Sequence, residues 1–401
     1  MASTFAWLDQ SEKQRRKVLE AIDLFREQGT RDELGISTIR DAFADLLFPG
    51  TGSLQTRARY FFFVPWMYQY LEQRRVPSAE VLKCTRAFEI ALINALADSD
   101  DPSGTIGIQS RAALQRFPSS IYWSGLGRVK IRNYPGSQDE YHRSLDGYYR
   151  GRLVVVRNDD GEPVTGRGAN WHHGIPSVAP GLPDKASFGL TQLEAEYLRE
   201  RVLTQAPGTF LAFLFDRHID PGDARFAWDH PVTGQLPQQL ARMLLHARNF
   251  SESIHGAAIL YNVMLADLGK REELRTKYRE MAAQWKADMG QAADRLASWD
   301  RAEFWRIVTE DGRNRVSPRT RQFVEAWLEV ALPAGNARAI VDSADAQELI
   351  HARERALKGP LARLDNPKAL DNWGGWSGLG RIDFRWSNAQ IIVRDVLAGL
   401  G

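Results

Sequence analysis

The chain has 401 residues, of which 43% are hydrophobic and 25% are charged, values that are ordinary for a globular protein of two or three domains. Its one cysteine, Cys84, excludes an internal disulfide framework and fits a reducing compartment. No apolar run approaches the ~18 residues that a membrane span needs, so we expect a cytoplasmic protein. The formal net charge is only +2, but the charges are unevenly distributed along the chain.

Hydrophobic periodicity predicts a mainly α-helical, multi-domain protein with a helix-turn-helix-like segment and little β structure. The first 102 residues are expected to form an N-terminal helical domain, which ends in a polar linker near residues 98–104. A capping box of Thr191 and Glu194 predicts the start of a C-terminal helical domain, 191–401. The helices expected from the pattern are 11–28, 36–47, 60–71, 78–96, 191–203, 236–268, 271–296, 301–309, 317–332, 344–364 and 389–397.

Between these helical domains we expect a small basic domain, 103–157, followed by a loop or linker, 158–190. Within the small domain, residues 106–116 and 120–131 are separated by the turn Phe117-Pro118-Ser119. Two short helices joined by such a turn form a helix-turn-helix pattern, in which the second helix is the recognition helix. The two glycines of the second segment weaken its helical tendency, so this helix is expected to be short.

The hexapeptide Trp-Ser-Gly-Leu-Gly-Arg occurs twice, at Trp123–Arg128 and at Trp376–Arg381. Each copy continues with an apolar residue, a charged residue, an apolar residue and an arginine, and the similarity then stops. One interpretation is a pair of turns, each packed by its tryptophan and each leading into a strand. The other interpretation is a pair of basic turns that bind one anionic ligand.

Basic residues are concentrated in residues 103–157, where nine of them, eight being arginine, stand against three acidic residues. Arginine suits bidentate contacts with phosphate, and a clustered basic patch is typical of nucleic-acid binding. The alternative is a solvated face that pairs with acidic residues elsewhere. The residues predicted to bind nucleic acid are Arg111, Arg116, Arg128, Lys130, Arg132, Arg143, Arg381 and Arg385.

Catalytic signatures are weak. The chain has no zinc or metalloprotease motif, no nucleophile elbow and no phosphate-binding loop. Asp216, His218 and His230 are weak candidates for a metal site, together with Asp220, because carboxylate and imidazole groups could hold a divalent ion. Ordinary polar loop residues are the favoured interpretation, so we predict no metal, no cofactor and no catalytic residue.

Several segments together resemble a known bacterial family. They include Phe5-Ala-Trp-Leu-Asp9, Leu47-Phe-Pro-Gly-Thr51, Pro118-Ser-Ser-Ile-Tyr-Trp123 and Phe384-Arg-Trp386. They are similar to domain-of-unknown-function family 6361, and the resemblance covers essentially the whole chain. It implies an anti-phage defence setting, with genes for a helicase and a phospholipase-D-type nuclease nearby, and it assigns no active site.

The sequence therefore predicts a non-enzymatic DNA-binding or adaptor component of an anti-phage defence complex. Its expected partners are DNA, as a duplex, and the helicase or the phospholipase-D-type nuclease of the same system. A metal-dependent nuclease and a pure protein–protein scaffold are the competing functions.

Overall fold

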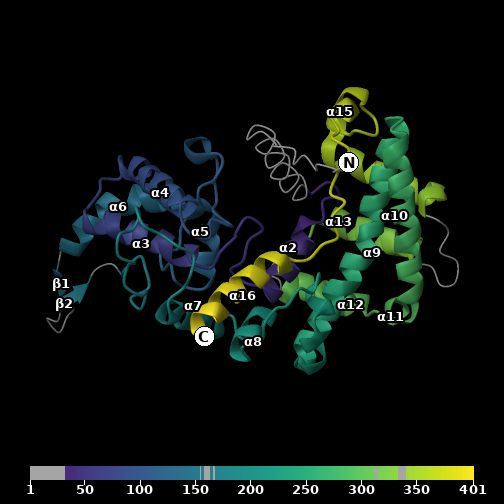
Figure 1. Ribbon diagram of the computed structural model, residues 1–401. Coiled ribbons are helices and arrows are strands. Elements are labelled where there is room, and N and C mark those ends of the chain that lie inside the picture. Colours follow the sequence, from purple (N-terminus) through teal and green to yellow (C-terminus); the bar gives the residue numbers. More distant parts are fainter. Residues whose placement is uncertain (1–31, 154, 158–162, 166–167, 312–314, 333–339) are drawn as a thin grey trace, which may run out of the picture. The chain divides into compact units, whose positions relative to one another are not determined.

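The computed structural model describes residues 32–153, 155–157, 163–165, 168–311, 315–332 and 340–401 (Figure 1). The described chain is mainly α-helical, as predicted. Its β structure is one antiparallel hairpin of β1 (Val155–Arg157) and β2 (Pro163–Thr165), in which Val156 pairs with Val164. The helix predicted at 11–28 lies outside the described residues. Within the described part, no helix has both the length and the apolar character of a membrane span.

The chain divides into two units, each made of segments that are distant in sequence. Among the described residues, unit 1 comprises those of 32–43 and 242–382, and unit 2 comprises those of 44–241 and 383–401. This division differs from the four consecutive segments predicted from the sequence. In particular, residues 103–157 belong to the same unit as the helices before and after them. The long-range packing of the C-terminal residues 383–401 with α7 and α8 could not be inferred from local periodicity.

The helices of unit 2 bury an aromatic core. Its central helix, α3 (Tyr60–Gln73), is buried on nearly every side, as the sequence predicts for this aromatic stretch. Tyr68 of α3 stacks on Trp171, with ring centroids 5.5 Å apart, and Trp123 and Tyr141 pack edge-on against the same rings. The other helices of this unit are α4 (Val81–Ala97), α5 (Pro118–Arg128), α6 (Gln138–Leu153), α7 (Gln192–Gln205), α8 (Phe210–Asp216) and α16 (Trp386–Leu400), with the 3₁₀ turns η1 (Arg111–Ala113), η2 (Ala227–Asp229) and η3 (Pro231–Gln235).

Unit 1 is organised along α9 (Gln238–Leu268), a helix of 31 residues whose first residues belong to unit 2. The indole N–H groups of Trp285 and Trp327 donate to carbonyls of α9, at 2.7 Å and 2.9 Å. Gly256 of α9 lies directly against the Trp285 ring, which leaves no space for a Cβ atom. The other elements are α10 (Glu272–Gln291), α11 (Ala293–Ala297), α12 (Arg301–Arg306), the π-helical stretch η4 (Ile307–Asp311), α13 (Pro318–Ala331), η5 (Ile340–Asp342), α14 (Ala344–Lys358), η6 (Gly359–Leu361) and α15 (Pro367–Asp371). Helix α2 (Ser37–Leu47) contains the first boundary between the units.

Two local predictions are wrong. The first helix of the expected helix-turn-helix is absent. Residues 106–116 instead contain turns, bends and the single 3₁₀ turn η1. The strand expected after the second hexapeptide is also absent, since residues 376–385 contain no strand and α16 begins at Trp386. The capping box at Thr191 and Glu194 is present as predicted at the start of α7.

Candidate nucleic-acid interface

Helix α5 is the helical half of the predicted helix-turn-helix, and it lies in an unusually basic stretch. Residues 103–138 contain no aspartate or glutamate. Helix α5 begins with Pro118, whose missing N–H is tolerated in a first turn. Its buried side packs into the aromatic core of unit 2, whereas Ser120, Ser124 and Arg128 are exposed. Because these three residues are spaced by four, they form one stripe along the exposed side of the helix.

Hydrogen bonds tie the segment that leads into α5 to the side of α4. The guanidinium of Arg111 donates to the side-chain oxygen of Asn94, at 2.6 Å, near the end of α4. Further along, the backbone N–H of Ser119 donates to Oε1 of Glu89, at 2.7 Å, in the middle of α4. The segment between these bonds therefore runs back along α4, and it carries the exposed Arg116 with it.

Three further exposed cations lie on the helices around this segment. Lys83 and Arg86 are exposed on α4, and Arg143 is exposed on α6. The α6 backbone at Arg143 lies near the start of α4, because its carbonyl accepts from the hydroxyl of Ser78 at 3.3 Å. We call this group the basic face. Its members are Lys83, Arg86, Arg111, Arg116 and Arg143.

The basic face lacks ion pairs within the described chain. In that part of the structure, none of its five members lies within 4.0 Å of a carboxylate oxygen. Glu140 lies one turn before Arg143, but its carboxylate accepts from the backbone and hydroxyl of Ser137 instead. Lys83 and Arg86 are not among the residues that the sequence pattern predicts. The helical period of α4 could have found them, since both lie opposite its buried apolar side.

Two other predicted residues lie at the far end of α5. Arg128 is exposed and donates one hydrogen bond to the carbonyl of Gln205, at 3.1 Å. Lys130 follows it and is also exposed. Neither forms an ion pair with a described residue, so both keep an uncompensated charge. They form a second, smaller basic pair, separated from Arg116 by the length of α5.

Arg132 is an internal residue, contrary to the prediction that it contacts a ligand. The residue is only 9% exposed, and its guanidinium carbon lies 4.4 Å from the centre of the Trp123 ring. It donates to the carbonyls of Trp123 and Gly136, each at 3.2 Å, and to that of Tyr134. Burial lowers the pKa of Arg132. The guanidinium therefore stabilises the turn after α5.

The second hexapeptide has a different conformation from the first. The first copy is helical, whereas Trp376–Arg381 lies as a non-helical segment against α9. The side chain of Asn262 accepts from the backbone N–H of Ser377 at 2.9 Å and donates to the carbonyl of the same residue at 2.7 Å. Two turns earlier on α9, His255 Nε2 lies 3.1 Å from the carbonyl oxygen of Leu379. Side chains of α9 thus replace the backbone partners that a helix or a strand would supply.

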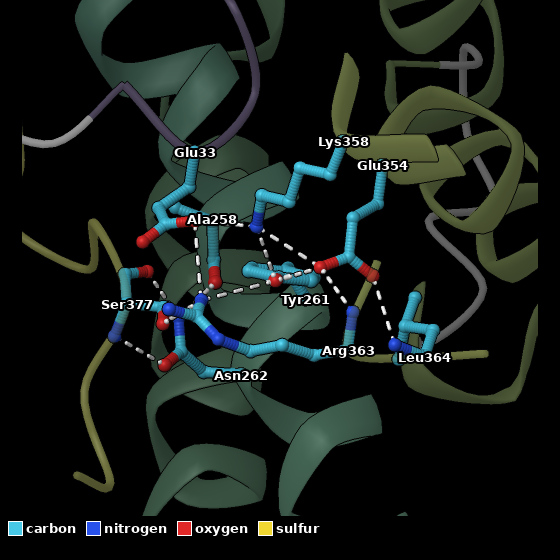
Figure 2. Close-up of polar contacts among 9 residues, drawn as sticks. All are labelled: Glu33, Ala258, Tyr261, Asn262, Glu354, Lys358, Arg363, Leu364 and Ser377. Carbon is cyan, nitrogen blue, oxygen red and sulfur yellow. Dashed lines mark hydrogen bonds and ion pairs between the residues drawn. The ribbon is translucent and has the colours of Figure 1, made fainter. Parts of the chain in front are cut away.

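A buried polar network holds the start of this segment (Figure 2). The carboxylate of Glu354 is fully buried and accepts from the Tyr261 hydroxyl, from Lys358 Nζ at 2.9 Å, and from the backbone N–H groups of Arg363 and Leu364, each at 3.0 Å. Burial alone would raise the pKa of Glu354, but these hydrogen bonds outweigh it and lower that pKa. The carboxylate therefore stays ionised, and both of its oxygens accept hydrogen bonds.

The remaining contacts of the network connect Glu33 to Lys358 and Arg363, and Arg363 to the second hexapeptide. Glu33 accepts from Lys358 Nζ at 2.5 Å and from Arg363 Nη1 at 3.1 Å. The same Arg363 nitrogen donates to the hydroxyl of Ser377, at 2.9 Å (Figure 2). Desolvation, together with the neighbouring Glu354 carboxylate, raises the pKa of Tyr261. With each charge paired, the arrangement suits stabilisation of the fold rather than proton transfer.

The arginine that ends the second hexapeptide and the arginine four residues later are both paired with carboxylates. Arg381 donates to Oε1 of Glu252 at 2.7 Å, within unit 1. Arg385 donates to Oδ1 of Asp45 at 2.7 Å and to the carbonyl of Thr51 at 2.9 Å, within unit 2. These two guanidinium charges are compensated inside the protein. Arg381 and Arg385 therefore differ from the residues of the basic face, which have no such partners among the described residues.

The weak metal candidates do not converge. Both ring nitrogens of His230 are occupied, since Nδ1 accepts from the backbone of Val232 at 3.1 Å and Nε2 lies 3.0 Å from the carbonyl of Asp220. Asp216 and His218 are exposed. Across the described residues, no three His, Cys, Asp or Glu side chains are arranged to hold a metal ion.

The fold and the basic face together define a mainly α-helical protein with a cationic surface that has no ion pairs among the described residues. The chain matches a family of unknown function, DUF6361, over residues 2–399, and it therefore belongs to that family. No curated protein and no solved structure matches it.

Proposed function

We propose that the protein is a non-enzymatic DNA-binding component that binds the sugar–phosphate backbone through the basic face. The observation that carries this proposal is that the five cations of the basic face have no ion pairs within the described chain, although elsewhere arginines such as Arg57, Arg59 and Arg363 are paired. Four of these cations are exposed and Arg111 is half-buried. Guanidinium and ammonium groups without carboxylate partners keep a positive potential that attracts phosphates. Four of the five members are arginines, which bind phosphate oxygens through two donors at once.

The shape of α5 adds to this argument. The exposed Ser120 and Ser124 are small, so a backbone phosphate can approach the helix closely, and each hydroxyl can donate a hydrogen bond. Arg128 and Lys130 extend the cationic surface beyond the end of the helix. Contacts of this kind recognise backbone charge and spacing rather than base identity. We therefore propose duplex DNA as the ligand, bound with little sequence preference.

The wider role follows from the family resemblance. We propose that the chain acts in anti-phage defence as an adaptor that holds a helicase or a phospholipase-D-type nuclease on DNA. A pure scaffold would bind such a partner without binding DNA. A metal-dependent nuclease at Asp216, His218 and His230 would cleave DNA with a divalent ion, and the occupied ring nitrogens of His230 argue against that arrangement.

Fluorescence anisotropy with a labelled duplex across a salt series tests the proposal. Five phosphate contacts predict a slope of log affinity against log salt of roughly −4.5. The triple variant Arg86→Ala, Arg116→Ala, Arg143→Ala removes three exposed cations of the basic face. Two contacts then remain, so we expect the slope to fall to roughly −2 and the affinity to drop by at least tenfold at low salt.

The matched control removes the same amount of charge elsewhere. Lys185, Lys277 and Lys286 are exposed, and none of them forms an ion pair with a described residue. Their triple replacement by alanine should leave both the slope and the affinity close to those of the parent protein. Equal losses in the two triple variants would show that binding follows net charge alone. Failure of the parent protein to bind duplex DNA at low salt would refute the proposed function.

A further inference from the structure

Glu89 lies beneath the basic face and caps α5 from a neighbouring helix. The residue that precedes α5, Phe117, has no side chain able to accept a hydrogen bond. Glu89 of α4 takes this role, because its Oε1 accepts from the backbone N–H of Ser119 at 2.7 Å. A carboxylate at this position also interacts favourably with the positive end of the helix dipole.

The carboxyl group of Glu89 has an incomplete set of partners. The residue is only 2% exposed, and its Oε2 atom has no hydrogen-bond partner in the described part of the chain. Burial raises the pKa of Glu89 to about 7, although the hydrogen bonds from Ser119 and the charge of Arg86 act in the opposite direction. A buried carboxyl with one unpartnered oxygen can gain or lose a proton without breaking its hydrogen bond to α5.

The other titratable groups around Glu89 are uncharged near neutral pH. From α3, Tyr60 and Tyr68 both have pKa values raised by burial. From α6, burial lowers the pKa of His142, whose Nε2 is 2.9 Å from the Tyr68 hydroxyl; the nearby Asp139 acts against that shift. The cation whose charge acts on Glu89 is thus Arg86. It lies three positions before Glu89 on α4 and belongs to the basic face.

We propose that phosphate binding at the basic face is linked to protonation of Glu89, so that DNA affinity rises as the pH falls through neutrality. This inference rests on the proposed function. An ionised Glu89 partly offsets the positive potential at Arg86, whereas the protonated, neutral form does not reduce this potential. A bound phosphate in turn disfavours the nearby carboxylate and favours proton uptake, because linkage is reciprocal.

The variant Glu89→Gln tests the linkage. The amide is nearly isosteric, keeps an oxygen for the Ser119 N–H, and carries no charge at any pH. For the parent protein we expect the dissociation constant for duplex DNA to rise roughly three- to tenfold between pH 6 and pH 8 at low salt, through the charge of Glu89. The variant should bind as tightly as the parent at pH 6 and lose this part of the pH dependence. Histidines that titrate in this range contribute equally to both proteins.

Calorimetry of the parent protein provides a second test that does not depend on the variant's folding. Binding at pH 7 in two buffers of different ionisation enthalpy should reveal a net uptake of roughly 0.3 to 0.5 proton. Binding with zero uptake at pH 7, or an identical pH dependence in parent and Glu89→Gln, would overturn the linkage and leave DNA binding intact. Absence of binding at both pH values would refute the proposed function, and the linkage with it.

Discussion

The two copies of Trp-Ser-Gly-Leu-Gly-Arg permit the same substitution at equivalent positions of an identical sequence. Ser124 and Ser377 occupy the second position of the two copies. Ser124 is exposed on helix α5, whereas Ser377 is 2% exposed and its hydroxyl accepts from Arg363 at 2.9 Å. If the copies differ as the structure shows, Ser124→Ala and Ser377→Ala must have different effects on stability.

The two magnitudes follow from these environments. At Ser124, alanine has the higher helix propensity and no hydrogen bond to a described residue is lost, so we expect a gain of about 0.5 kcal/mol. At Ser377, alanine removes the acceptor of a charged donor, and such bonds contribute roughly 1.5–3 kcal/mol. Arg363 keeps its contacts with Glu33 and Tyr261, which places the expected loss near the lower end, about 1.5 kcal/mol.

Urea denaturation followed by far-ultraviolet circular dichroism measures both effects, provided that the slope of the transition is unchanged. The midpoint should rise slightly for Ser124→Ala and fall clearly for Ser377→Ala. If the two unfolding free energies agreed within about 0.3 kcal/mol, the two serines would have equivalent environments. That result would refute the assignment of one copy to a helix and of the other to a segment bound along α9.

Two further predictions concern the glycines of the repeat and the buried network. Gly125→Ala should destabilise the protein by about 2 kcal/mol or more, since its Cβ would collide with the backbone carbonyl of Gly50, whereas Gly380→Ala meets no atom within 4 Å and should be tolerated; equal melting temperatures for the two variants would contradict this. Glu354→Gln should lose about 2 kcal/mol at pH 7. Because folding lowers the pKa of Glu354, its contribution is present above the ordinary value of 4.5 and disappears as the pH falls through the folded value, so the difference between parent and variant should shrink in acid. A difference that is constant from pH 7 to pH 3 would show that the charge of Glu354 does not contribute.

Local sequence signals predicted most of the helices but not their long-range partners. The aromatic stretch of α3 and the capping box of α7 were identified correctly, because periodicity and capping depend on residues close in sequence. The discontinuous units depend on packing between segments hundreds of residues apart, such as α16 against α7, and no local pattern reports such contacts.

The hexapeptide shows most directly why identical sequence did not predict identical structure. In the first copy, Gly125 is needed because α5 packs tightly against the carbonyl of Gly50. In the second copy, the equivalent Gly378 has a φ of +58°, a conformation that disfavours residues with a Cβ atom. The same glycine thus satisfies two unrelated requirements, and only the surrounding chain determines which one applies.

The same comparison separates the basic residues into two roles. The sequence pattern groups Arg116 and Arg132, from the basic stretch 103–157, with Arg381, which ends the second copy of the repeat. The structure distinguishes them by their partners: Arg132 stacks on Trp123 in the core, Arg381 pairs with Glu252, and Arg116 is exposed without a carboxylate partner in the described chain. A guanidinium that is already paired loses an existing interaction when it binds a phosphate, whereas an unpaired one does not. Charge compensation, which sequence cannot report, is therefore the criterion that selects the basic face as the candidate interface.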